Sequence, residues 1–141
     1  MADCRTKMKN KALNIVIIDD NQHLLASLEN LLTILGHTVF AASTAEAGMQ
    51  LVQERRPGML FCDIALQGKI NGYGVARMLR MNAAVAGAFF VALSGNSTQE
   101  DREKSVQAGF DRHVAKPASL ADISGVLDAA WIHQLRQAPG S

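Results

Sequence analysis

Cysteine, long apolar runs and excess charge are all scarce in this sequence, and each scarcity excludes a class of protein. The two cysteines, Cys4 and Cys62, are too few and too far apart for a zinc cluster or a disulfide framework. The apolar runs fall far short of the roughly 20 residues of a membrane-spanning helix, and the first residues lack the apolar core of a signal peptide. The formal net charge of +1 argues against bulk electrostatic binding to nucleic acids or membranes. We therefore expect a cytoplasmic protein with reduced thiols and no direct nucleic-acid or membrane partner.

The length and composition fit a single globular domain. A chain of 141 residues can bury about two-thirds of its unfolded surface in one core, and it has no room for a second folded unit. Hydrophobic residues make up 48% of the chain and charged residues 19%, which is an ordinary globular mixture. We expect the folded domain to cover residues 12–136, with flexible tails at 1–11 and 137–141.

Apolar patterns alternate between the two kinds of regular structure along the chain. Short runs rich in β-branched or aromatic residues predict strands, and leucines at helical spacing after the first strand predict a helix. Two capping-box patterns, which begin at Ser43 and Ser97, predict the starts of two further helices. The expected strands are 14–18, 38–41, 59–63, 88–94 and 112–115, and the expected helices are 22–35, 43–56, 73–82, 97–109 and 120–135.

This alternation predicts a parallel sheet covered by helices on both faces, because right-handed crossovers place the helices there. Ligands of such α/β folds gather beyond the carboxyl ends of the strands. Asp19 and Asp20 follow the first strand, Asp63 closes the third, Ser94 closes the fourth and Lys116 follows the fifth. The sequence therefore predicts that these five polar residues converge on one edge of the sheet.

Three carboxylates at one edge repel one another unless a cation compensates them. Magnesium suits such a site, because it prefers carboxylate oxygens and waters and readily bridges to a phosphoryl group. The ammonium group of Lys116 and the hydroxyl group of Ser94 would complete a phosphoryl pocket, and one aspartate would be the nucleophile. The alternative reading of Asp19 and Asp20 is an N-cap and a first-turn carboxylate of the following helix.

Four motifs, in order and at matching spacing, resemble those of the receiver domains of two-component response regulators. They are IVIIDDN after the first strand, LFCDIAL around Asp63, VALSG at the fourth strand and GFDRHVAKP at the fifth, and the resemblance covers residues 13–135. It implies a flavodoxin-like, doubly wound α/β fold with five parallel strands in the order 2-1-3-4-5. It also implies a signalling domain rather than an enzyme, with at most slow self-phosphorylation from small donors and slow autodephosphorylation.

The resemblance assigns a role to each residue of the site. Asp63 would accept a phosphoryl group from a sensor histidine kinase or a histidine phosphotransfer protein. Mg²⁺ (or Mn²⁺) would be bound directly by Asp20 and Asp63, mainly through water by Asp19, and by the backbone carbonyl of Ala65. Lys116 would pair with Asp63 and then with its phosphoryl group.

The resemblance also implies a switch from the phosphorylation site to a partner-binding surface. Ser94 would shift its hydroxyl toward the phosphoryl group, and His113 stands where many receivers carry Tyr or Phe. A histidine can titrate near neutral pH, so the switch could respond to pH, although a satisfied polar ring is the simpler reading. The downstream protein target would bind the face made by the helix at 97–109, the strand at 112–115 and the helix at 120–135. The protein would be a monomer or a phosphorylation-dependent dimer.

Some positions depart from the family pattern. Gln67 stands where proline is common, and the loop before Gly72 is one residue longer than usual, which affects the expected start of the next helix but not Ala65. Ala65 and Asn96 occupy the two variable positions that tune hydrolysis of the aspartyl phosphate. Because Ala65 cannot position a water, we expect slow self-dephosphorylation. The Lys116–Pro117 bond matches the family's cis peptide.

Two other functional classes stay open at this stage. A magnesium-dependent phosphatase of the haloacid dehalogenase type would use Asp19 as its nucleophile, but it usually has a second aspartate where Asn21 stands. A scaffold that keeps the fold without phosphorylation is the other alternative, and the intact set of acidic, hydroxyl and lysine residues argues against it. The chain could also be a piece of a hybrid sensor kinase, because receivers with similar loops often lie at the end of such proteins.

Overall fold

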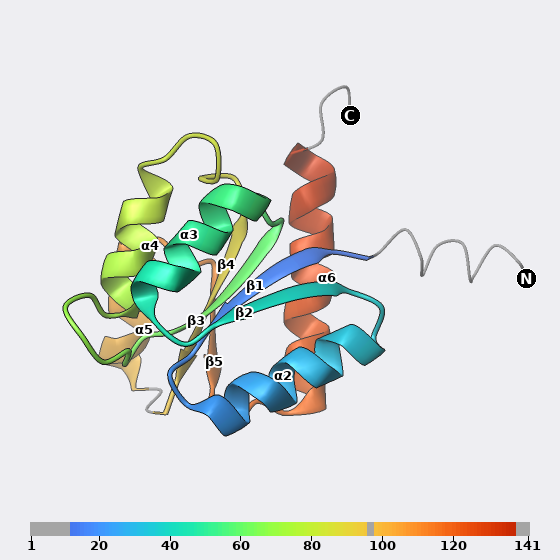
Figure 1. Ribbon diagram of the computed structural model, residues 1–141, viewed down its shortest axis with the longest axis horizontal. Helices are drawn as coiled ribbons and strands as arrows, with labels where there is room; N and C mark the ends of the chain where they lie inside the picture. Colours follow the sequence, from blue (N-terminus) through green and yellow to red (C-terminus); the bar gives the residue numbers. More distant parts are fainter. Residues whose placement is uncertain (1–11, 96–97, 138–141) are drawn as a thin grey trace, which may run out of the picture.

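A computed structural model describes residues 12–95 and 98–137, and it has the predicted alternation of five strands and five helices. Figure 1 shows the elements in chain order. They are β1 (Asn14–Ile18), α2 (Gln22–Ile34), β2 (Thr38–Ala42), α3 (Ala45–Arg55), β3 (Met59–Asp63), α4 (Gly72–Arg80), β4 (Phe89–Ser94), α5 (Gln99–Ala108), β5 (Arg112–Ala115) and α6 (Leu120–Gln137). The strands form one parallel sheet in the order β2-β1-β3-β4-β5, which confirms the expected topology.

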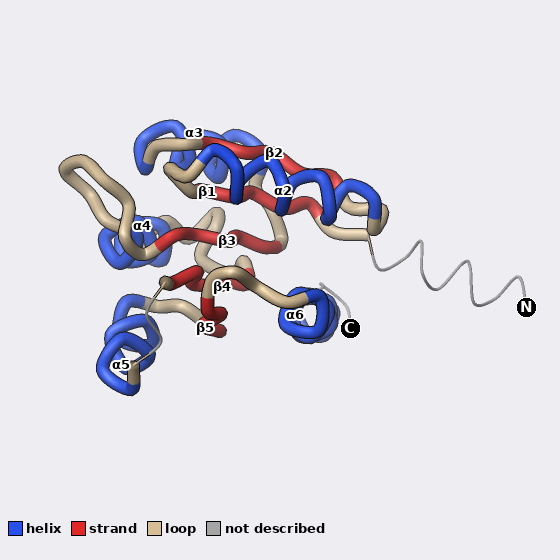
Figure 2. The backbone as a smooth tube through the Cα atoms, turned by 90° about the horizontal axis from the view of Figure 1, so that it is seen from below, coloured by secondary structure: helices blue, strands red, loops and turns tan. Residues whose placement is uncertain are grey.

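The sheet is buried on both faces, which explains why its central strands are apolar without alternation. Successive side chains of a strand point to opposite faces. In β1, Val16 and Ile18 therefore join the core under α3, α4 and α5, whereas Ile15 and Ile17 join the core under α2 and α6. Figure 2 shows the sheet between these two helical layers. None of the helices in the described part of the chain combines the length and apolar character that crossing a bilayer requires.

Two helices begin one residue later than the capping-box patterns predict. Thr44, not Ser43, caps α3, and its hydroxyl oxygen accepts a hydrogen bond from the backbone of Ala47 at 3.2 Å. Thr98 caps α5 and exchanges hydrogen bonds with Asp101, whereas Ser97 lies outside the described residues. The register chosen for α3 turns Ala45, Gly48 and Val52 toward the sheet, so burial decides between adjacent hydroxyl residues.

One arginine fastens the end of the sheet opposite the predicted site. Arg80, in the last turn of α4, pairs with Asp111 at 2.8 Å and lies 3.6 Å from the ring centre of Phe90. Its guanidinium also donates to three backbone carbonyls of neighbouring loops, those of Ala86, Ala88 and Gly109. Asp111 in turn accepts a hydrogen bond from the Phe90 backbone at 2.9 Å. This Arg80 clamp joins α4, the start of β4 and the turn between α5 and β5.

Candidate functional site

The carboxyl ends of the strands bring the predicted acidic residues together. Asp19 and Asp20 follow β1, and Asp63 is the last residue of β3, paired in register with Leu93 of β4. Carboxylate oxygens of the three aspartates lie within 4.8 Å of one another. Asp19 is 1% exposed and Asp63 is 4% exposed, so two of the three charges are almost fully removed from solvent. Hard oxygen donors at this separation fit a small divalent cation.

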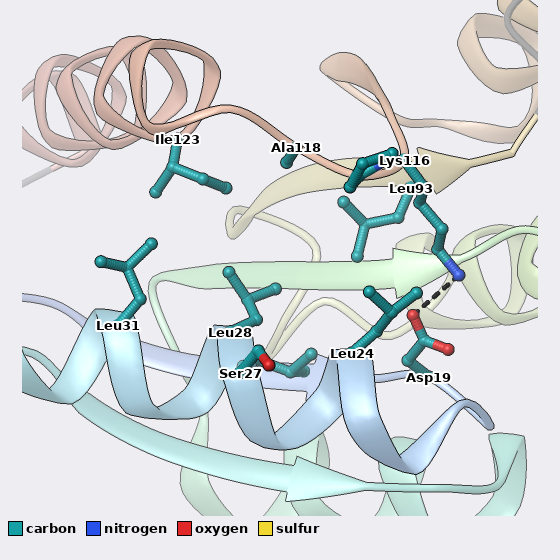
Figure 3. Close-up of a pocket in the computed structure, with 11 residues that line it drawn as sticks. Asp19, Leu24, Ser27, Leu28, Leu31, Leu93, Lys116, Ala118 and Ile123 are labelled. Atoms are coloured by element: carbon teal, nitrogen blue, oxygen red, sulfur yellow. Dashed lines mark ion pairs between the residues drawn. The ribbon is translucent and has the colours of Figure 1, made fainter.

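The Lys116 ammonium forms ion pairs with two of these carboxylates. Its Nζ atom lies 2.8 Å from Asp19 Oδ2 and 3.2 Å from Asp63 Oδ2. The resemblance implied the pairing with Asp63, whereas the shorter contact with Asp19, visible in Figure 3, was not expected. The Lys116–Pro117 peptide bond that leads out of the site is cis, as the resemblance implied.

Backbone N–H groups hold one oxygen of each carboxylate. Asp19 Oδ1 accepts from the backbone of Asn21 at 2.9 Å, and Asp63 Oδ1 accepts from Ala65 at 2.9 Å. Asp20 Oδ2 accepts from Gln67 at 3.0 Å, so the loop after β3 is tied to the loop after β1. Among the described residues, every buried polar side-chain atom has a hydrogen-bond partner.

The acidic pair does not cap the helix that follows it. Asn21 is the N-cap of α2, and its side-chain oxygen accepts from the backbones of His23 and Leu24. The first turn of α2 contains no acidic residue. The simple capping interpretation of Asp19 and Asp20 is therefore wrong, and their carboxylates face the site instead.

The loop between β3 and α4 leads into an N-cap at Asn71, and α4 begins at Gly72, one residue before the expected start. Gly68 adopts a left-handed conformation with φ of +111°, and Asn71 caps α4 by accepting from the backbone of Gly74. Gly72 passes so close to β3 that an added Cβ atom would lie 2.4 Å from the carbonyl oxygen of Asp63. Only glycine fits there without displacing the end of β3.

Burial and charge act against each other on the ionisable groups. The pKa of Asp63 is raised, mainly by burial and further by the Asp19 carboxylate. The hydrogen bond from the Ala65 backbone and the Lys116 ammonium act in the opposite direction and lower it. Burial lowers the pKa of Lys116, but the contacts with Asp19 and Asp63 outweigh it, so the pKa is raised and the amine stays charged. Burial, followed by the Asp63 carboxylate, raises the pKa of Cys62. This thiol is a small apolar group in the core, as predicted.

The two predicted switch residues lie on neighbouring strands. Ser94, 3% exposed, ends β4 and its carbonyl accepts from the backbone of Lys116 at 2.7 Å. His113, in β5, is half-buried, and its Nδ1 atom lies 2.9 Å from the hydroxyl oxygen of Ser105 in α5. Ser105 is 1% exposed and also hydrogen-bonds the phenol of Tyr73. Burial raises the pKa of the Tyr73 phenol, and the hydrogen bond with Ser105 partly opposes this effect. Sequence reasoning missed Ser105, whose only signal was a small polar residue within a largely exposed helix. Asn96 lies outside the described residues.

The fold and this edge of the sheet define a class, a doubly wound α/β domain with three clustered carboxylates and a lysine at the carboxyl ends of its strands. Comparison with known families identifies it more closely. Residues 15–128 match the family model described as response regulator receiver domain, so the chain belongs to that family. Receiver domains of two-component systems are signalling domains rather than enzymes, and they bind Mg²⁺ in an acidic pocket.

Relatives and solved structures agree with this family. The chain is 31% identical over 116 residues to a probable transcriptional regulator, ycf27, of Porphyra purpurea, covering 82% of this chain and 46% of that protein. It thus spans about half the length of the curated regulators that it first matches. Protein PilG of Pseudomonas aeruginosa is 24% identical over 123 residues, which cover 87% of this chain and 90% of PilG. A CheY-like receiver domain protein from Methanospirillum hungatei superposes with a TM-score of 0.81 at 22% identity, covering 90% of this chain and 99% of that one, and supports the fold.

Proposed function

We propose that the protein accepts a phosphoryl group on Asp63 from a phosphohistidine donor, and that phosphorylation switches a partner-binding face. The donor would be a sensor histidine kinase or a histidine phosphotransfer protein. The observation that carries the proposal is the position of Asp63, which ends β3 within a cluster of three carboxylates and lies 3.2 Å from the Lys116 ammonium. Family membership supports a phosphorelay role, and it also supports a cytoplasmic location.

The proposed transfer uses a carboxylate oxygen of Asp63 as the nucleophile. The oxygen attacks phosphorus, the bond between phosphorus and the donor's imidazole nitrogen breaks, and that nitrogen keeps the electron pair. Lys116 is placed to stabilise negative charge on the phosphoryl oxygens, because its ammonium already lies between two carboxylates. Asp63 must ionise to act, and Lys116 together with the Ala65 N–H group opposes the effect of burial on its pKa.

The donor set fits magnesium or manganese, which would neutralise the carboxylates and supply positive charge for the incoming phosphoryl group. We assign direct contacts to Asp20, Asp63 and the backbone carbonyl of Ala65, and a contact through water to Asp19. Gln67 supports this arrangement, since its N–H group orients the Asp20 carboxylate. Asp19 already has Lys116 as a counter-ion, which fits its more distant place in the metal site.

The output would pass through Ser94 and His113 to the face formed by α5, β5 and α6. Ser94 connects the site to β5 through the backbone of Lys116, and His113 connects β5 to α5 through Ser105. A phosphoryl group that interacts better with one arrangement of these residues shifts the population toward it. A downstream protein would bind that arrangement, with the receiver as a monomer or a phosphorylation-dependent dimer.

We further propose a long-lived aspartyl phosphate. The side chain of Ala65 is exposed beside the site and carries no group that can orient a water. An Ala65→Asn variant should lose its phosphate faster than the wild type when release is followed after removal of the donor. Equal rates in the two proteins would contradict this part of the proposal.

Intact mass after incubation with acetyl phosphate and magnesium tests the central step. One phosphoryl adduct should form on the wild type and on an Asp128→Asn control, which alters an exposed aspartate of α6, and it should be absent from Asp63→Asn and without the metal. No adduct on a folded protein with bound magnesium would favour the phosphorylation-independent scaffold. Continuous release of phosphate that depends on Asp19 would instead favour the dehalogenase-type phosphatase.

A further inference from the structure

The helix α5, which lies beside the edge strand β5, has few buried side chains to attach it to the domain (Figure 2). Only Ser105 and Ala108 of this helix are buried, and Ala108 offers a single methyl group. The Arg80 clamp holds the turn that follows the helix, because the Arg80 guanidinium donates to the carbonyl of Gly109. Ser105, one turn before that point, is thus a polar attachment in a helix with little apolar contact.

The partner of Ser105 on the sheet is His113 of β5. Val114 joins the core under α2 and α6, so its neighbour His113 points to the opposite face, toward α5. The Oγ atom of Ser105 lies 2.9 Å from His113 Nδ1, and the phenol of Tyr73 in α4 also bonds this hydroxyl. Because Ser105 is 1% exposed, water does not replace a contact that its hydroxyl loses.

The number of available protons assigns the direction of the contact with His113. Ser105 Oγ also lies 3.0 Å from the backbone oxygen of Asp101. Two oxygens at that distance need a proton between them, and the carbonyl has none, so the hydroxyl donates to Asp101. A serine hydroxyl has only one proton to give, so it accepts from His113. The Nδ1 atom of His113 must therefore carry a proton and act as the donor.

β5 joins this pair of residues to the predicted phosphorylation site. Lys116 follows the strand, and its backbone donates to the carbonyl of Ser94 at 2.7 Å. His113 lies three residues earlier and pairs in register with Ala92 of β4. A change at the site that shifts this end of β5 would therefore displace His113 as well. Because the ring is bonded to Ser105, the displacement would reach α5 close to its clamped end.

We propose that Ser105 is a positioning residue of the switch. Its hydroxyl holds the His113 ring with Nδ1 as the donor, so that β5 and α5 move as one unit and α5 tilts about its clamped end. The movement on phosphorylation rests on the proposed function, whereas the direction of the hydrogen bond does not. A serine that only bonds the carbonyl four residues back in its own helix would have neither effect.

The hydrogen-bond direction is tested without phosphorylation, in long-range ¹H–¹⁵N spectra of the imidazole nitrogens of the full chain. The pH is about 8, where an unperturbed histidine is neutral. His113→Gln identifies the His113 signal among those of the four histidines. Ser105→Ala removes the acceptor, Ser105→Thr keeps a hydroxyl, and Ser124→Ala is the matched control, because Ser124 is an exposed serine of α6. Circular dichroism establishes that each variant is folded.

We expect a protonated Nδ1 atom of His113 in the wild type, in Ser105→Thr and in Ser124→Ala. In Ser105→Ala the Nδ1 resonance should move toward that of an unprotonated nitrogen, because the acceptor that fixes the proton is removed. An unprotonated Nδ1 atom in the wild type would overturn the proposal, and this measurement needs no variant of Ser105. An Nδ1 resonance in folded Ser105→Ala that equals the wild-type one would overturn it as well.

The coupled movement is measured in backbone ¹H–¹⁵N spectra before and after treatment with acetyl phosphate and magnesium, once intact mass has established the adduct. Amides of β5 and α5 should both shift in the wild type and in Ser124→Ala. In Ser105→Ala the β5 shifts should persist, and the α5 shifts should be severalfold smaller. Equal α5 shifts in Ser105→Ala and the wild type would overturn the coupling. If no protein forms the adduct, the proposed function fails and the movement with it, whereas the Nδ1 proton still decides whether Ser105 positions His113.

Discussion

Replacement of Lys116 by methionine should destabilise the metal-free protein strongly. The ammonium lies 2.8 Å from Asp19 and 3.2 Å from Asp63, and at an effective dielectric constant of about 20 each contact is worth about 5–6 kcal/mol of Coulomb attraction. Desolvation offsets much of this energy, because the Lys116 side chain is only 16% exposed. Removing one partner of a buried ion pair nevertheless leaves uncompensated charge, and typical losses are about 3–5 kcal/mol. Methionine keeps most of the apolar stem, so the loss reports on charge.

Urea unfolding at neutral pH with EDTA measures this loss, because the free energy extrapolates linearly to water. Lys104→Met is the matched control, since Lys104 pairs with Glu100 at 3.2 Å on the exposed face of α5 and should show no loss beyond error. Magnesium should restore part of the stability of Lys116→Met. A loss below about 1 kcal/mol for Lys116→Met, which is typical of exposed pairs, would refute the view that this lysine compensates buried carboxylates.

Three other changes probe the structure away from the ammonium group. Gly72→Ala should lower the free energy of unfolding by about 1–3 kcal/mol in urea titrations and slow phosphoryl uptake, because the added methyl group displaces the backbone of Asp63. Arg80→Met should cost about 3 kcal/mol in the same assay, since it removes a charged donor from several partly buried acceptors. Burial lowers the pKa of His37, whose Nδ1 atom accepts from the backbone of Leu13. Its stabilising contribution is therefore complete above the unfolded pKa of about 6.5 and is lost as the pH falls toward the folded value, so thermal unfolding of His37→Gln should be less sensitive to acid.

Two control variants replace a glycine in another helix and an arginine in the same helix as Arg80. Gly125→Ala in α6 meets no atom within 4 Å, so it should stabilise the helix rather than weaken the protein. Arg77→Met changes an exposed arginine of α4 and should be close to neutral. Equal effects of Arg77→Met and Arg80→Met, or of Gly125→Ala and Gly72→Ala, would contradict the contacts described. If His37→Gln were as sensitive to acid as the wild type, the proposed contribution of His37 to the pH dependence of stability would be contradicted.

The sequence was sufficient to predict the sheet, because strands that are buried on both faces are continuous apolar runs that can be recognised in the sequence. The run Ile15–Ile18 has no alternation, and its short length and β-branched residues favour a strand covered on both faces over a buried helix. The polar residues at strand ends were equally readable, since the carboxyl ends of parallel strands meet at one edge. The convergence of Asp19, Asp20 and Asp63 followed from topology alone.

Features that depend on contacts between distant segments could not be read in the same way. The Asp20–Gln67 hydrogen bond joins residues 47 positions apart, and it involves a backbone group that any residue would offer. The sharing of Lys116 with Asp19 depends on the separation of two strand ends to within an ångström. Ser43 and Thr44 present two adjacent caps that local pattern cannot rank, and the core beneath α3 makes the choice.

The Arg80 clamp and the acidic cluster lie at opposite ends of the sheet, and their interactions differ in how strongly they respond to ions and ligands. The clamp joins backbone segments through hydrogen bonds, an aromatic contact and one partly exposed ion pair, and only the ion pair is screened strongly by ions in solution. The opposite end carries buried like charges, whose repulsion changes with every cation or phosphoryl group that arrives. Local opening should therefore begin at the charged end and stop at the clamp. Amide protons near Gly109 should exchange only when the whole protein unfolds. The exchange of amide protons near Ala65 should become slower when a cation binds. The domain therefore has one end whose rigidity depends on its ligands.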